Sequence, residues 1–98
     1  MRSVNLPNMK PNVELPEQQA YTLEIIMSGG ESSVSSLALI EGGILNPPNV
    51  ISKLRKHGAI IKTKRMSAID AQGRRRSGIA HYTYLGWRPL SEEERNFA

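Results

Sequence analysis

The sequence predicts an α+β fold in which three helices are followed by a C-terminal β-hairpin. Three segments between residues 17 and 57 carry apolar residues at helical spacing, and glycine follows each segment. After Gly58 the period changes to two, and two alternating segments flank three arginines at residues 74–76. A chain of 98 residues makes one domain with a modest core.

The first 16 residues predict a flexible, Pro-rich arm. They contain three of the six prolines, which disfavour both helix and strand, so an extended and partly disordered segment is expected. A first helix of 11 to 13 residues is expected after Pro16, because Glu17 favours the positive end of the helix dipole. Gly29 and Gly30 are expected to end that helix.

A second, shorter helix is expected from the next apolar stripe. Ser32 and Ser33 offer its N-cap, and glycines 42 and 43 stop it. In the turn that follows, Ile44 and Leu45 are expected to fill the core.

The third helix is expected from Asn46 or Pro47 to His57. Its apolar side is formed by Val50, Ile51 and Leu54. The polar residues at i, i+3, i+4 and i+7 lie on the opposite side, and these are Asn49, Ser52, Lys53 and Lys56.

The hairpin is expected to end in a long, flexible loop with the arginines of residues 74–76 at its tip. Lys62 and Lys64 share one face of the first strand, while Arg65 points to the other face. The domain therefore spans residues 17–88. Residues 89–98 form an acidic C-terminal tail that begins like a short capped helix.

Positive charge is concentrated in the second half of the chain. Residues 53–88 contain ten Lys or Arg and one acid, Asp70, whereas the rest contains three basic and eight acidic residues. Such an asymmetry favours a polyanionic partner, with a solvated lysine-rich face as the alternative.

Several segments resemble a known family. The stretch Val-Ile-Ser-Lys-Leu-Arg-Lys-His-Gly at residues 50–58 is followed by Ile-Lys-Thr at 61–63, Gly-Arg at 73–74 and Tyr-Thr-Tyr-Leu at 82–85. With residues 38–44 as second helix and turn, this pattern resembles the small winged helix-turn-helix domains of phages and prophages. The resemblance covers residues 18–86 and implies a transcriptional regulator or accessory DNA-binding protein of a mobile element.

In such a domain the third helix, at about residues 47–57, enters the major groove of double-stranded DNA. The residues expected to face DNA are Asn49, Ser52, Lys53 and Lys56. Arg55 lies between faces, so a phosphate contact and a structural ion pair to the wing both remain open. Lys62 and Lys64 are expected to serve phosphates, and Arg74, Arg75 and Arg76 to meet the backbone or a narrow minor groove.

Other classes of function find little support in the sequence. There is no cysteine, and His57 and His81 are too few to complete a metal site, so neither metal nor cofactor is expected. No catalytic constellation is visible, and an enzyme is not expected. No apolar run is long enough for a membrane span and no signal peptide is present, so a cytoplasmic location is expected.

Two further partners remain open. A winged helix can serve as a protein-interaction module, engaging a host or phage protein through the acidic tail or the apolar turn. A homodimer could form through the N-terminal arm or residues 91–97, because small helix-turn-helix proteins often read two half-sites.

Overall fold

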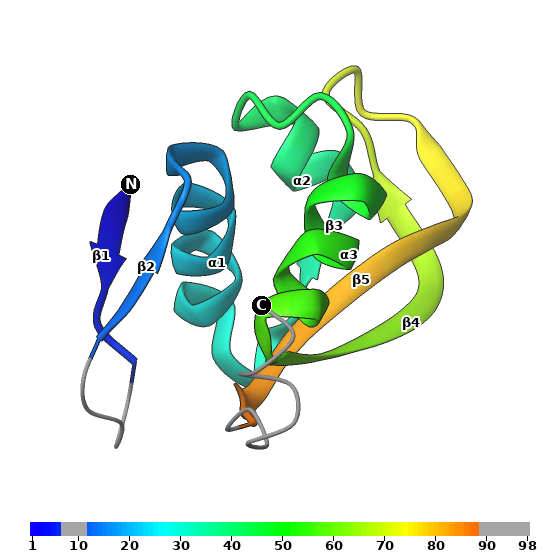
Figure 1. Ribbon diagram of the computed structural model, residues 1–98. Helices are drawn as coiled ribbons and strands as arrows, with labels where there is room; N and C mark the ends of the chain where they lie inside the picture. The colour runs from blue at the N-terminus through cyan, green and yellow to red at the C-terminus, as the bar shows by residue number, and fades with distance from the viewer. Residues whose placement is uncertain (7–11, 89–98) are drawn as a thin grey trace.

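The computed structural model describes residues 1–6 and 12–88, and it places three helices against a three-stranded sheet (Figure 1). The helices are α1 (Glu17–Gly29), α2 (Ser36–Glu41) and α3 (Pro47–His57), with a 3-10 turn, η1 (Gly30–Ser32), after α1. The strands are β1 (Arg2–Val4), β2 (Val13–Leu15), β3 (Val34–Ser35), β4 (Ala59–Ile69) and β5 (Arg75–Trp87).

The first and third helices confirm the predicted segments. α1 follows Pro16 and has an acid, Glu17, in its first turn, where the helix dipole favours negative charge. α3 is preceded by its N-cap, Asn46, whose side-chain Oδ1 accepts a 3.4 Å hydrogen bond from the N–H of Asn49. The C-cap that follows it is Gly58, whose φ of 127° is one that residues with a Cβ rarely adopt.

The predicted start of the second helix is wrong by two or three residues. Its N-cap is Ser35, whose Oγ accepts a 3.0 Å hydrogen bond from the N–H of Ala38. Ser33 instead has a positive φ of 59° and turns the chain, so that Val34 pairs with Tyr82 in the sheet rather than starting the helix.

The sheet contains one more strand than the predicted hairpin. Its order is β3–β5–β4, with both neighbouring pairs antiparallel. β4 and β5 form the long hairpin, and register shifts occur between Ile60 and Ile61 and between Met66 and Ala68. Such irregularities increase the twist of a strand pair, and the hairpin bows outward in its middle before its tip comes back toward α2 (Figure 1).

The N-terminal segment is not an unpacked arm where the structure describes it. β1 and β2 form an antiparallel ribbon against α1, on the side away from α3 (Figure 1). Val4, Leu6 and Leu15 are fully buried, which favours order over the conformational freedom that the prolines suggested. Arg2 adds ion pairs of 3.0 Å to Glu17 and 2.6 Å to Glu24 on α1. Residues 7–11 and the predicted tail, residues 89–98, lie outside the described residues.

The core lies between the helices and the inner face of the sheet. α3 contributes Val50, Ile51 and Leu54 on its predicted apolar side, all at most 2% exposed. Of the two turn residues expected to fill the core, Ile44 does so, but Leu45 is 86% exposed. Because Val50, Ile51 and Leu54 turn one side of α3 into the core, the opposite side of the helix faces solvent.

Candidate nucleic-acid interface

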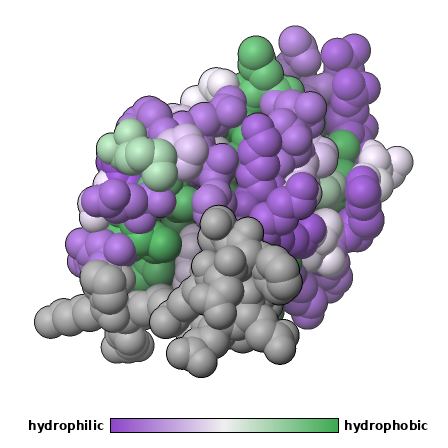
Figure 2. All heavy atoms as spheres, in the orientation of Figure 1, coloured by the Kyte–Doolittle hydropathy of each residue, from purple (hydrophilic) through white to green (hydrophobic). Residues whose placement is uncertain are grey.

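The exposed side of α3 carries the polar residues that the sequence singled out. Asn49, Ser52, Lys53 and Lys56 are all exposed. Because successive helix residues are about 100° apart, Asn49, Ser52 and Lys56 lie directly opposite the buried stripe. Lys53 lies on the flank away from the hairpin. The surface over α3 and the hairpin is largely hydrophilic (Figure 2).

Arg55 lies on the other flank of α3 and joins the helix to β4. Its Nη2 donates to the carbonyl oxygen of Ile61 at 2.8 Å and to Oγ1 of Thr63 at 2.7 Å. Of the two roles left open by the sequence, the structural link is therefore present, although its acceptors are a carbonyl and a hydroxyl rather than an acid. The rest of the guanidinium keeps donors for another partner.

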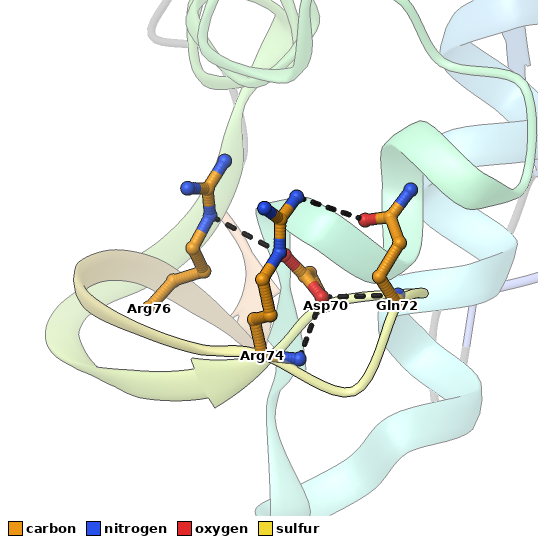
Figure 3. A network of polar contacts seen from close by, with 4 residues as sticks. All are labelled: Asp70, Gln72, Arg74 and Arg76. Atoms are coloured by element: carbon orange, nitrogen blue, oxygen red, sulfur yellow. Dashed lines mark hydrogen bonds and ion pairs between the residues drawn. The ribbon is translucent and has the colours of Figure 1, made fainter.

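The tip of the hairpin is a short, ordered turn rather than the long flexible loop expected. It spans only residues 70–74, and the N–H of Asp70 donates to the carbonyl oxygen of Arg74 at 2.9 Å. The Asp70 carboxylate closes the turn, because Oδ1 accepts from the N–H of Gln72 at 3.0 Å and of Arg74 at 2.9 Å (Figure 3). Arg75 and Arg76 belong to β5, not to a loop.

Asp70 also holds two of the three arginines. Its Oδ2 lies 3.5 Å from Nε of Arg74 and 3.5 Å from Nε of Arg76 (Figure 3), but it accepts no hydrogen bond from a described residue. The Asp70 side chain is only 10% exposed, whereas those of Arg74 and Arg76 are 67% and 55% exposed. Both pairs use Nε, so most of the terminal guanidinium N–H groups remain available at the surface.

The remaining arginine of the tip, Arg75, is tied across the hairpin. Its Nη2 donates to Oγ of Ser67 on β4 at 3.1 Å. The three arginines thus extend from a braced turn and its adjoining strand, which lowers the entropy lost when they meet a ligand.

The cations of β4 divide between the two faces of the sheet. Ile61 is buried against the helices, and Thr63 and Arg65 continue on its face toward α3. Lys62 and Lys64 lie on the opposite face, where they line a hollow with Thr83 and residues of η1. The predicted alternation is confirmed, and Arg65, rather than the two lysines, lies on the α3 side.

A groove of about 500 Å³ on this side lies between the hairpin and the surface formed by α2, the turn after it and α3. Arg55 and Ile51 of α3 line one wall, and Thr63, Arg65 and Tyr82 of the sheet line the other. Burial raises the pKa of the Tyr82 hydroxyl above its ordinary value of 10.0, and the charges of Arg65 and Arg55 only partly offset this effect. Like any tyrosine with a pKa of 10.0 or above, Tyr82 is neutral at physiological pH and can donate a hydrogen bond.

Two residues of this region were not singled out from the sequence. Arg65 was expected on the face away from the site. Ile60 and Ile61 lie on opposite faces of β4, so the sequence does not show which face is buried against the helices. Asp70 was counted only as a lone acid, although an Asp three residues before a Gly between two strands is a turn signal.

Two absences concern the part of the chain that the structure describes. Residues 1–6 and 12–88 contain no group of three or more His, Cys, Asp or Glu side chains that could bind a metal. In the same ranges, every helix is too short or too polar to traverse a lipid bilayer.

Comparison with known proteins supports the fold. Residues 17–85 match a family model described as a winged helix-turn-helix domain. The match includes all three helices and most of the hairpin. No curated protein and no solved structure matches the chain significantly.

Proposed function

The chain belongs to the family of winged helix-turn-helix domains, and we propose that it binds double-stranded DNA in a sequence-specific manner. α3 is the recognition helix in the major groove, and the β4–β5 hairpin is the wing, which meets the backbone or the adjacent minor groove. The role is that of a transcriptional regulator or accessory factor of a phage or other mobile element, acting in the cytoplasm by binding rather than by catalysis.

One observation carries the proposal: the exposed side of α3 and the arginines of the wing are cationic and free of acid except for Asp70. Between Lys53 and Arg76 that carboxylate is the only acid. It is nearly buried under two arginines that are themselves exposed. A surface of this kind attracts the phosphate backbone.

The side chains along α3 suit base recognition. Asn49 offers the amide that pairs bidentately with adenine, and Lys56 offers a donor for guanine or phosphate. Ser52 lies between them on the same exposed stripe and can donate to or accept from a base edge. Phosphate contacts by the wing would fix the register of this stripe on the duplex.

Fluorescence anisotropy with a labelled duplex, titrated with salt, tests the proposal. If Lys53, Lys56 and the three wing arginines each neutralise one phosphate, the log–log slope of affinity against salt is about −4.5. Binding that is absent at low salt, or that shows no slope, would contradict the proposal. The matching single strand is the control, because a major-groove reader requires the duplex.

A second candidate function is a protein-interaction module that engages a host or phage protein. Leu45, in the turn between α2 and α3, is 86% exposed, and a hydrophobic patch is visible over that turn (Figure 2). Nearby Ile40 is 46% exposed. Such a surface suits an apolar partner, and this binding would survive the high salt that removes phosphate contacts.

A further inference from the structure

The groove between α3 and the wing has an apolar part and a part with cationic and neutral donors. The apolar part contains Ile40, Leu45, Pro47, Pro48, Ile51 and Ala80. Arg55 and Arg65 face it from opposite walls, and Tyr82 and Thr63 add hydroxyl groups. None of the residues that line it is acidic. A groove with two guanidinium groups and no carboxylate suits an anion.

Both arginines are held in place by the protein itself. Arg55 uses Nη2 for its two contacts to β4, and Arg65 uses Nη1 to donate to the carbonyl oxygen of Gly78 at 3.1 Å. Each guanidinium has five N–H donors, so each retains several for a ligand. Their positions are therefore fixed before any ligand arrives, which reduces the entropic cost of binding.

Tyr82 adds a donor without adding negative charge. It is 3% exposed, and among the described residues its hydroxyl has no hydrogen-bond partner. At neutral pH a tyrosine hydroxyl is protonated, so it does not repel an anion. A hydroxyl without a partner in the protein can donate a hydrogen bond to a ligand oxygen that reaches it.

We propose that this groove binds one phosphodiester group of the DNA strand, with Arg55, Arg65 and Tyr82 as its donors. The inference rests on the proposed function and adds a binding site to it. When a helix lies in the major groove and a wing meets the adjacent minor groove, the backbone that separates the two grooves must pass between helix and wing. The groove occupies that position.

This site differs from the phosphate contacts expected from the sequence. Those were assigned to Lys62 and Lys64, which lie on the other face of β4. Arg65 and Lys64 are therefore a matched pair: they are neighbours on one strand, both exposed and both cationic, on opposite faces. A general loss of positive charge affects both, but a phosphate in the groove requires only Arg65.

The first test compares Arg65→Gln with Lys64→Gln in duplex binding across salt. Arg65→Gln is expected to weaken binding roughly tenfold at low salt and to reduce the log–log slope by about 0.9. Lys64→Gln is expected to change both quantities less. Equal effects, or a larger effect of Lys64→Gln, would overturn the site. Thermal melts of both variants verify that the fold is intact.

The second test isolates the hydroxyl of Tyr82. Tyr82→Phe removes only that donor and is expected to weaken duplex binding severalfold, roughly the effect of one hydrogen bond to a charged acceptor. Tyr84→Phe is the matched control, since Tyr84 is a partly buried tyrosine of the same strand that does not line the groove. If the two variants bind DNA equally well, Tyr82 is not part of the site.

A third measurement separates the site from the proposed function. Inorganic phosphate is titrated into the full chain and followed by amide chemical shifts, with chloride at equal ionic strength as the control. Shifts at Arg55, Thr63 and Arg65 that are lost in Arg65→Gln support an anion site even if no duplex binds, in which case only the DNA proposal fails. Shifts confined to the wing tip, or none, overturn the site even if the duplex binds.

Discussion

Asp70 and Arg74 are joined twice, through the backbone and through the side chain. The carboxylate Oδ1 accepts a 2.9 Å hydrogen bond from the N–H of Arg74, and Oδ2 lies 3.5 Å from its Nε. One acid thereby shapes the turn of the wing and positions a cation at its surface. Its two roles can be separated by substitution.

Asp70→Asn keeps a side-chain oxygen for the turn but removes the charge, whereas Asp70→Ala removes both. Asp70→Ala is expected to speed amide hydrogen exchange at Gln72 and Arg74, corresponding to about 1 kcal/mol per lost hydrogen bond. Asp70→Asn is expected to leave exchange nearly unchanged and to strengthen non-specific DNA binding, because a negative charge is lost beside the arginines. Equal exchange in the two variants would show that the carboxylate does not shape the turn.

The two lysines of α3 are expected to differ in their effect on DNA binding. Lys56 lies on the outward stripe and Lys53 on a flank, so Lys56→Ala is expected to weaken duplex binding by roughly 1–3 kcal/mol and Lys53→Ala by less. The double variant is expected to bind weakly with the fold intact, as judged by circular dichroism. Lys62→Ala, on the far face of β4, is the charge-matched control. No loss of gel-shift activity in the double variant would contradict the assignment of α3 as recognition helix.

The link from Arg55 to Thr63 is expected to stabilise the helix against the wing. Thr63→Val removes one acceptor of Arg55 and is expected to lower the unfolding free energy by about 1 kcal/mol in urea denaturation. Thr83→Val is the control, because Thr83 lies on the opposite face and its hydroxyl has no hydrogen bond within the described residues. A loss of similar size in Thr83→Val would assign the effect to strand propensity.

Gly58 is required by both conformation and space. A Cβ there would lie 2.8 Å from the carbonyl oxygen of Arg88 and 2.8 Å from Nε1 of Trp87, at a φ of 127°. Gly43 also has a positive φ, of 102°, but a Cβ there would meet nothing within 4 Å. Gly43→Ala is expected to cost about 1 kcal/mol and Gly58→Ala clearly more, near 3 kcal/mol. Equal melting temperatures for the two variants would contradict the close packing of Trp87 on Gly58.

The raised pKa values of two tyrosines, Tyr82 and Tyr84, predict that the free energy of unfolding decreases at alkaline pH. Burial raises the pKa of Tyr82 and of Tyr84 above 10.0. Below pH 10 both the folded and the unfolded chain hold these protons, so the contribution to stability is complete. Above pH 10 the unfolded chain loses the tyrosine protons before the folded chain does. The free energy of unfolding therefore falls with pH until the pH exceeds the folded-state pKa values. In urea denaturation the double variant with Phe at both positions is expected to show a shallower fall, and an unchanged fall would contradict the prediction.

The long helices could be predicted because their signals are local. α1 follows a proline and an acid, and α3 is bounded by Asn46 and Gly58, so cap chemistry and apolar period agree. The start of α2 could not be predicted, since Ser32, Ser33, Ser35 and Ser36 are all candidate caps in the sequence. Only pairing of Val34 with Tyr82, a tertiary contact, selects Ser35.

The N-terminal ribbon and the orientation of the wing also depend on tertiary contacts. The strands β1 and β2 have three residues each, which is too short for an alternating apolar pattern to be recognised in the sequence. The ribbon is stable because Val4 and Leu15 are buried against α1. On β4, the neighbouring residues Ile60 and Ile61 lie on opposite faces of the strand. Because both are isoleucine, the sequence does not show which face is buried. The structure buries Ile61, at 7% exposed against 43% for Ile60, and this places Arg65 beside α3.

Selection of bound sequences from a pool of random duplexes, with wild type and Asn49→Ala in parallel, tests the central claim most directly. The account predicts that wild type enriches a defined motif and that Asn49→Ala relaxes one position of it, because an amide that reads adenine is lost. If wild type enriches no motif, or if Asn49→Ala enriches the same motif equally well, α3 does not read DNA as proposed.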